Sequence, residues 1–200
     1  FWIRRAFRAE VEQKFQDSER FLREAVKVDN GFAPRAALMN YYFRRQDIPQ
    51  FREAARAALR TAYSDRRPIF RLCFAAGDDI AATKALLPPG HRPLVDLLAF
   101  LMESGRLAQA PDIASAVASE ADADDLNLLL GYVEQQTGKN DASAGAVWNA
   151  LCARRLVPFS PLSPDQGTII TNGDFEGTLS RGFDWRFGPA GGVAISHSFA

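Results

Sequence analysis

The chain contains few of the residues that most often carry chemistry, with two cysteines, two histidines and two methionines in 200 residues. Cys73 and Cys152 lie far apart, without a CxxC pair or a histidine nearby in sequence. We therefore expect two small apolar side chains rather than a disulfide framework or a zinc site. His91 lies beside a proline turn and His197 near the end, and neither belongs to an HExxH motif. The sequence predicts neither a metal site nor a cofactor.

Catalytic motifs are also missing. No GxSxG nucleophile elbow and no GxxxxGK[ST] phosphate loop occurs. The glycine-rich segment 188–192 leads into a β-type segment rather than a helix, so it does not form a phosphate cradle. The carboxylate pairs 78–79 and 124–125 precede helical patterns, where capping and the helix dipole account for them. We therefore expect no catalytic residues and a chain that is not an enzyme.

Neither an excess of one charge nor a long apolar run is present. Lys plus Arg and Asp plus Glu are both 24, so the formal net charge is zero. The general attraction to phosphate backbones is then absent, and nucleic acid is not an expected partner. No segment approaches the roughly 18–20 apolar residues that cross a bilayer, so no membrane span is expected. With 47% apolar and 24% charged residues, the composition is that of an ordinary folded chain.

What the sequence does contain is a series of amphipathic helices. Apolar residues between 51 and 63 recur at i, i+3, i+4, i+7 and i+8, which predicts one apolar stripe on a helix that starts near Pro49. The segment 34–45 carries a similar stripe, and the short connector 46–48 indicates an antiparallel helical hairpin. Further helices are predicted over 94–102, from Arg106 to Val117, over 126–137 and 142–151, with two short ones over 68–75 and 79–87.

The helices recur with a fixed spacing. Gly105 and Gly138 both follow an apolar stripe, where a helix end needs a residue that tolerates positive φ, and they are 33 residues apart. Ala25 and Ala58 occupy matching points of their own stripes and are also 33 residues apart. A helix-pair period of about 34 residues is typical of a stacked α-solenoid.

The segments 33–48, 100–110 and 130–138 resemble the tetratricopeptide repeat family. The chain departs from the family pattern in three ways: the early tryptophan is absent, Met39 stands where glycine is usual, and residues 64–93 form a degenerate unit. This resemblance implies a mainly α fold, an α-α superhelix of antiparallel helix pairs. The positions that fit the repeat are Leu38, Tyr42, Ala58, Leu107, Ala110, Leu130, Gly131 and Gly138.

The resemblance also implies a function. Inner helices of such repeats form a concave groove that holds a protein or peptide, so we expect a non-enzymatic interaction or scaffold module. Here the groove helices are predicted over 34–45, 94–103 and 124–136. For each candidate the alternative is a solvated side chain with no partner. The candidate partner-binding residues are Arg35, Asn40, Arg44, Asp96, Asn127 and Glu134.

After Val157 the sequence changes character. A proline-rich segment, 158–164, is followed by short β-branched and alternating segments over 168–171, 182–187 and 192–199. Two or three short strands need a larger sheet to be stable, so they indicate the start of a truncated β-sandwich. The predicted organisation is a solenoid over 1–157, a linker over 158–167 and β-sandwich strands over 168–200.

The run 169–176, followed by Trp185, resembles the opening of carbohydrate-binding jelly-roll modules. This implies an alternative function, in which the completed β domain binds a polysaccharide in exopolysaccharide handling. Asp174 and Glu176 suit turn and edge-strand roles better than a calcium site, which needs six to eight oxygens. For Trp185 we favour core or inter-domain packing over sugar stacking. The predicted inter-domain contact consists of Trp148, Phe159 and Trp185.

The whole arrangement resembles bacterial envelope-associated proteins that join a helical-repeat region to a β-sandwich tail. The segments that carry this resemblance are 1–8, 148–152, 172–176 and 183–185. It implies a periplasmic or envelope location ahead of a cytoplasmic one.

Overall fold

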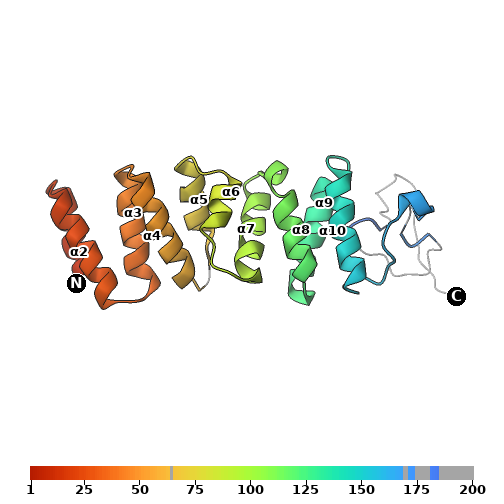
Figure 1. The fold of residues 1–200 in the computed structure, drawn as a ribbon, viewed down its shortest axis with the longest axis horizontal. Coiled ribbons are helices and arrows are strands. Elements are labelled where there is room, and N and C mark those ends of the chain that lie inside the picture. Colours follow the sequence, from red (N-terminus) through yellow and green to blue (C-terminus); the bar gives the residue numbers. More distant parts are fainter. Residues whose placement is uncertain (64, 169–170, 174–180, 185–200) are drawn as a thin grey trace, which may run out of the picture. The chain divides into compact units, whose positions relative to one another are not determined.

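The computed structural model describes residues 1–63, 65–168, 171–173 and 181–184. This described part of the chain is mainly α-helical, with ten α-helices and three short 3₁₀ helices (Figure 1). Consecutive helices pack in pairs, as the sequence predicted. The chain forms two compact units, Phe1–Phe100 and Leu101–Ala200.

The first unit is built from successive antiparallel helices. The α1 helix packs on α2, α3 packs on α4, and α2 also contacts α3. The α4 helix then contacts α5, which contacts α6. The bounds of these helices are α1 (Trp2–Val11), α2 (Phe15–Val28), α3 (Phe32–Arg44), α4 (Ile48–Thr61), α5 (Arg67–Ala75) and α6 (Ile80–Ala85).

The α3–α4 hairpin shows why these residues form helices. Gln46 takes a positive φ of 56°, which turns the chain sharply after α3. The Asp47 carboxylate then accepts a hydrogen bond from the Gln50 amide at 3.3 Å and caps α4. The predicted stripe of α4 is confirmed from Phe51 to Ala62, since its members Phe51, Ala54, Ala55, Ala58, Leu59 and Ala62 are buried. It was wrong at Tyr63, which follows the end of the helix and is 94% exposed.

The α7 helix (His91–Glu103) contains the boundary between the two units. The two short helices predicted before it correspond to α5 and α6. The Asp79 carboxylate caps α6 by accepting a hydrogen bond from the Ala82 amide at 2.7 Å. Gly90, with φ 119°, makes the turn that the proline pair before it predicted.

The second unit contains η1 (Leu107–Gln109), α8 (Pro111–Glu120), η2 (Ala123–Asp125), α9 (Leu126–Gln136) and α10 (Asp141–Ala153). The prediction that a helix starts at Arg106 was wrong, because α8 begins at Pro111. Pro111 has no N–H to donate and a fixed φ, so it suits a first helical position, and the residues before it form a separate 3₁₀ turn. Gly105 and Gly138 have φ values of 70° and 76°, as their positions after the apolar stripes predicted.

The α10 helix packs against both α8 and α9. A buried polar network lies within this packing. The Gln136 amide donates to the Tyr132 hydroxyl at 3.1 Å and to the Leu107 carbonyl at 3.3 Å. The Tyr132 hydroxyl also lies 2.6 Å from the Ser143 hydroxyl. Because each buried polar group has a partner here, the network fixes α9 against α10 and against the 3₁₀ turn.

The predicted β-sandwich strands are not seen among the described C-terminal residues. Thr168 forms only an isolated bridge to Ser163, beside η3 (Pro164–Gln166). Residues 182–184 form a turn where a strand was predicted to begin, because Gly182 has φ 83°. Most of the 169–176 run, and all of 185–200, lie outside the described residues. None of the described helices is long and apolar enough to cross a membrane.

Candidate functional site

Three predicted partner-binding residues lie on α3 and contact their own unit. The Arg35 guanidinium donates to the Gly31 carbonyl at 2.9 Å, and the Asn40 amide donates to the Ala36 carbonyl at 2.8 Å. Arg44 donates two hydrogen bonds to the Glu10 carboxylate of α1, at 3.0 and 2.7 Å. Arg44 therefore joins the first two helix pairs, and its binding role stays a prediction.

Asp96 of α7 anchors the chain that follows α4. Its carboxylate accepts a hydrogen bond from Arg66 at 2.5 Å, and both side chains are only 13% exposed. Arg92, one helical turn earlier, lies 3.5 Å from the same carboxylate. Asp96 also lines a surface depression of about 510 Å³ beside the exposed ring of Tyr63.

The other two predicted residues lie on α9, in the second unit. Asn127 is exposed in the first turn of the helix. Glu134 is partly buried, and its carboxylate accepts two hydrogen bonds from Arg181, at 3.1 and 2.7 Å. The structure therefore divides the six candidates between the two units, with four in the first and two in the second.

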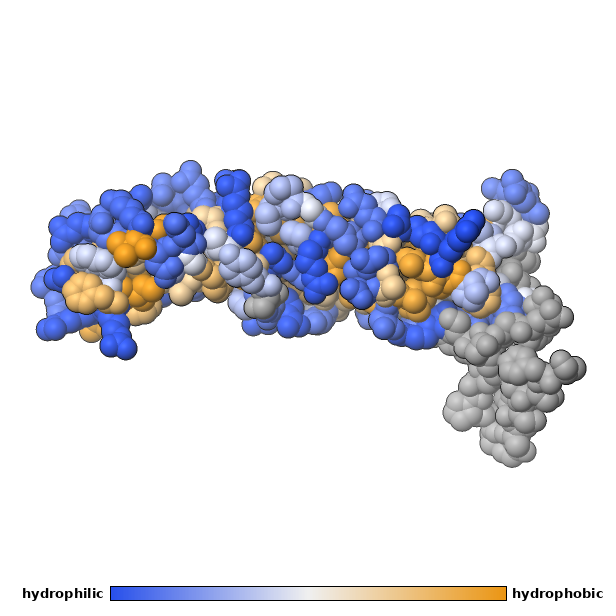
Figure 2. Space-filling model, turned by 90° about the horizontal axis from the view of Figure 1, so that it is seen from below, coloured by the Kyte–Doolittle hydropathy of each residue, from blue (hydrophilic) through white to orange (hydrophobic). Residues whose placement is uncertain are grey.

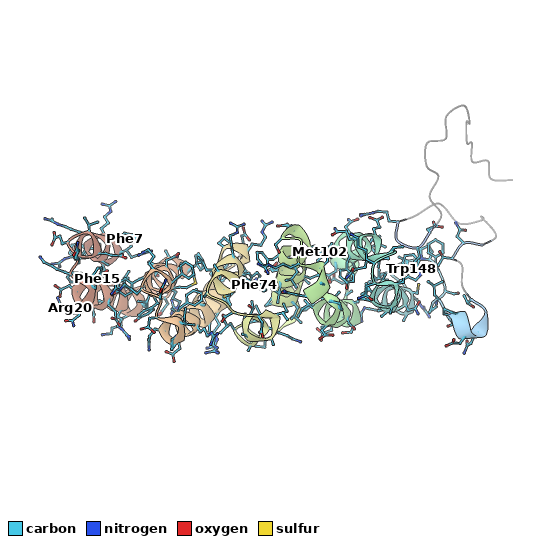
Figure 3. The ribbon with its side chains drawn as sticks, turned by 90° about the horizontal axis from the view of Figure 1, so that it is seen from above. Phe7, Phe15, Arg20, Phe74, Met102 and Trp148 are labelled. Atoms are coloured by element: carbon cyan, nitrogen blue, oxygen red, sulfur yellow. The ribbon has the colours of Figure 1, made fainter. Side chains whose placement is uncertain are left out.

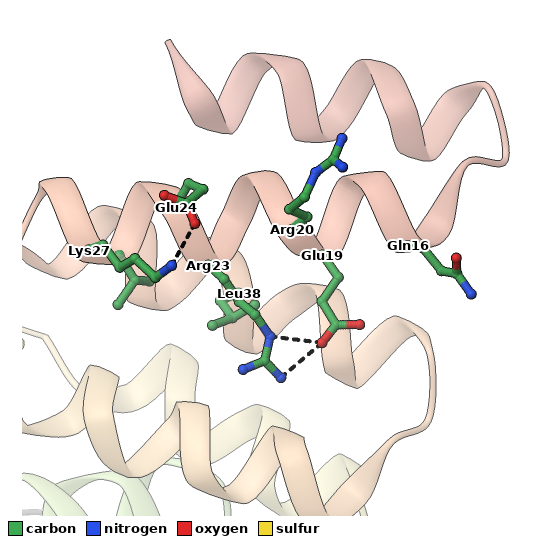
Figure 4. Close-up of a pocket in the computed structure, with 8 residues that line it drawn as sticks. Gln16, Glu19, Arg20, Arg23, Glu24, Lys27 and Leu38 are labelled. Atoms are coloured by element: carbon green, nitrogen blue, oxygen red, sulfur yellow. Dashed lines mark hydrogen bonds and ion pairs between the residues drawn. The ribbon is translucent and has the colours of Figure 1, made fainter.

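A second depression, of about 580 Å³, lies between α2 and α3 (Figure 4). Sequence reasoning did not find it, because it depends on how two helices meet. Its apolar floor includes Leu38 of α3, and charged side chains of α2 of both signs surround that floor. The residues that line it are Gln16, Glu19, Arg20, Arg23, Glu24, Val26, Lys27 and Leu38.

The charges around the α2–α3 depression are paired along α2. Arg23 pairs with Glu19 at 2.9 Å and Lys27 with Glu24 at 2.6 Å, while Arg20 pairs with Asp17 at 2.8 Å. The basic side chains are exposed, and exposed ion pairs contribute only about 0–1 kcal/mol each. Breaking these intramolecular pairs therefore costs little.

One residue of this depression, Glu19 of α2, also forms a hydrogen bond with α3. The Tyr42 hydroxyl of α3 donates a hydrogen bond to the Glu19 carboxylate at 2.8 Å. Burial, followed by this hydrogen bond, raises the pKa of Tyr42 well above its ordinary value, so the hydroxyl keeps its proton. The Glu19 carboxylate is thereby bonded both to Tyr42 and to Arg23, the latter drawn in Figure 4.

The predicted inter-domain residues Trp148 and Phe159 lie together in the second unit. Trp148, labelled in Figure 3, is fully buried on α10. Its ring stacks on Phe159, with centroids 5.8 Å apart, and meets Phe183 edge-on at 6.0 Å. Trp185 lies outside the described residues. Phe183 was missed because the sequence reasoning favoured the tryptophan two positions later.

Both cysteines are buried among the described residues. Among them, no group of three or more His, Cys, Asp or Glu side chains could hold a metal ion. Burial, and then the Asp78 charge, raises the pKa of Cys73 to about 12, and burial raises that of Cys152 to about 11. Neither thiol is a nucleophile at neutral pH.

Comparison with known proteins gives no template for these surfaces. The chain matches no protein-family model, no curated protein and no solved structure. The function must therefore be argued from the geometry of the molecule.

Proposed function

We propose that the chain is a non-enzymatic protein-interaction module of the tetratricopeptide-like type, which binds a protein or peptide at the α2–α3 depression. The observation that carries this proposal is the depression itself, which combines apolar side chains, exposed basic side chains and partly exposed carboxylates. Consecutive helix pairs that pack on one another support the comparison with helical repeats.

The chemistry of the depression describes its ligand. Leu38 and Val26 can bury an apolar side chain. Arg20 and Lys27 are 65% and 69% exposed, so they can pair with carboxylates of the ligand. Glu19 and Glu24 can pair with its basic groups. A peptide with one apolar anchor flanked by charges of both signs fits this surface best.

A peptide-display selection on the whole chain tests the proposal. The affinity of the selected peptide is then measured for the wild type and for the double variant Arg20→Glu/Lys27→Glu. We expect the double variant to bind at least about tenfold more weakly, because it loses two charge pairs and gains repulsion. Arg60→Glu, at an exposed position of α4, is the matched control and should bind like the wild type. Equal binding by the double variant and the wild type would contradict the proposal.

The glycan-binding alternative stays a prediction. It depends on the 169–176 run and Trp185, most of which lie outside the described residues. A glycan array probed with the chain would decide between the alternatives. The envelope or periplasmic setting in a bacterium is likewise a prediction, and fractionation of the source cells would check it.

A further inference from the structure

Three consecutive residues near the C-terminus, Arg181, Gly182 and Phe183, contact α9 and α10 through three different kinds of interaction. The first is electrostatic. Nε and Nη2 of Arg181 donate to the two Glu134 oxygens at 3.1 and 2.7 Å, in the fork geometry that distinguishes arginine from lysine. The Glu134 carboxylate also lies 3.5 Å from the Gly182 amide, so one side chain contacts two successive residues.

The second interaction is the close packing of Gly182, which leaves no room for a side chain. A Cβ at Gly182 would lie 2.5 Å from Cζ3 and 2.9 Å from Cε3 of Trp148, and 3.3 Å from Cδ2 of Leu130. No Cβ fits at 2.5 Å from a buried indole ring, and the backbone at Gly182 has φ 83°. Only glycine satisfies both conditions.

The third interaction is aromatic. The Phe183 ring meets the Trp148 ring at an interplanar angle of 80° with centroids 6.0 Å apart, which is a favoured edge-to-face geometry. Phe159 stacks on the same indole, so Trp148 contacts aromatic rings from two separate segments. Figure 2 shows that apolar side chains also interrupt the hydrophilic surface over α9 and α10.

We propose that α9 and α10 form a recognition site for an arginine–glycine–phenylalanine segment, and that residues 181–183 of the same chain occupy it. Each residue of the segment is recognised separately: arginine by Glu134, glycine by the closeness of Trp148, and phenylalanine by its edge-to-face contact with the indole. The site is therefore specific for a sequence, and a partner that carries the same tripeptide can compete for it. This site shares no residue with the α2–α3 depression, so each of the two proposals is tested independently of the other.

Residues 181–183 occupy the site because they belong to the same chain as α9 and α10. Arg181 is 49% exposed and Glu134 is 24% exposed, so their pair lies partly in water and contributes modestly. Because both parts belong to one chain, the segment binds in an intramolecular step, which raises its effective concentration above that of a free peptide. A free peptide of the same sequence must compete against that concentration, and it binds well only when the chain's own segment is disabled.

A fluorescent peptide with the sequence of residues 180–184, Ser-Arg-Gly-Phe-Asp, tests the proposal. It is titrated into the wild type and into Arg181→Ala/Phe183→Ala, whose own segment cannot occupy the site. We expect at least tenfold tighter binding to the double variant. A matched peptide with alanine in place of glycine should lose at least tenfold in affinity, because its Cβ would overlap Trp148.

Three results would overturn the inference: no binding to the double variant, equal binding of the glycine and alanine peptides, or equal binding to the double variant and the wild type. If the double variant does not fold, as judged by circular dichroism, the charge swap Glu134→Arg/Arg181→Glu replaces it. Each single change of this pair should expose the segment to proteolysis, and the swap should restore its protection. Failure of the swap to restore protection would also reject the assignment.

Discussion

At the scale of single residues, one ionic contact involves a fully buried carboxylate: it joins Arg52 of α4 to Asp78, in the turn between α5 and α6. Both Nε and Nη2 of Arg52 donate to one oxygen of Asp78, the Nε bond at 2.8 Å. The Asp78 side chain is 0% exposed, whereas Arg52 is 46% exposed. The second Asp78 oxygen has no hydrogen-bond partner among the described residues. Arg52 therefore compensates almost alone for a buried charge.

Replacing Arg52 by alanine should lower the free energy of unfolding, because the buried Asp78 carboxylate loses its counter-charge. Urea denaturation followed by circular dichroism measures this change. Arg60→Ala, an exposed position of the same helix, should change stability by less than about 0.5 kcal/mol. Adding Asp78→Asn to the Arg52 variant should recover part of the loss. Equal effects of the Arg52 and Arg60 changes would reject this account.

The two buried thiols predict a pH dependence. Their pKa values, about 12 for Cys73 and about 11 for Cys152, lie above the ordinary value of 9.0. Above pH 9 the unfolded chain releases protons that the folded chain keeps. The free energy of unfolding should therefore be unaffected by the thiols below pH 9 and should fall as the pH rises towards 11 and 12.

Alkylation gives a direct check on the same groups. At about pH 8, iodoacetamide should modify neither thiol quickly in the folded chain and both in urea, since only the exposed thiolate reacts. The measurement is mass spectrometry of the two cysteine peptides over time. Rapid labelling of Cys73 in the folded chain would contradict its burial in the structure.

At the scale of the helix, small residues allow close approach. Ala54, Ala55 and Ala58 are buried on one stripe of α4, and α4 contacts both α3 and α5. The sequence could predict this helix because its apolar residues follow the helical period. It could not predict the start of α8, because the residues between Gly105 and Pro111 have helical propensity but form a 3₁₀ turn.

Ala58→Leu should destabilise the chain by about 1–3 kcal/mol, because a well-packed site has no room for three more carbon atoms. Thermal or urea unfolding measures the effect. Ala81→Leu, at an exposed position of α6, is the matched control and should be nearly neutral. If both substitutions are neutral, the α4 stripe is less closely packed than its burial indicates.

The candidate sites show the limits of sequence reasoning at this scale. Arg44 and Glu134 were selected as exposed groove residues, yet they pair with Glu10 and Arg181, which are 34 and 47 positions away. Periodicity identifies the face of a helix on which a charge lies. It does not reveal which distant charge will meet it. The α2–α3 depression was missed for the same reason, because neither helix contains it alone.

At the scale of the whole molecule, the net charge is zero, but the charges are distributed unequally between the two halves of the sequence. Residues 1–100 hold 18 of the 24 basic and 12 of the 24 acidic residues. They therefore carry a formal charge of +6, and residues 101–200 carry −6. Opposite halves of neighbouring molecules attract one another, and this attraction is strongest when salt does not screen it.

We expect the second virial coefficient at pH 7 to be negative at low ionic strength and to rise as salt is added. Static light scattering measures it. The charge-exchange variant Arg60→Glu/Asp124→Lys keeps the net charge at zero but reduces the division, so its salt dependence should be weaker. A coefficient that does not change with salt would contradict this prediction.

The side chain of Asn149 occupies the backbone hydrogen-bonding groups of Leu162, through which a neighbouring strand would pair. The Asn149 amide of α10 donates to the Leu162 carbonyl at 2.8 Å and accepts from the Leu162 amide at 2.7 Å. A side chain thus supplies the pair of hydrogen bonds that a neighbouring strand would otherwise make. With its N–H already used, Leu162 cannot serve as an edge for strand addition.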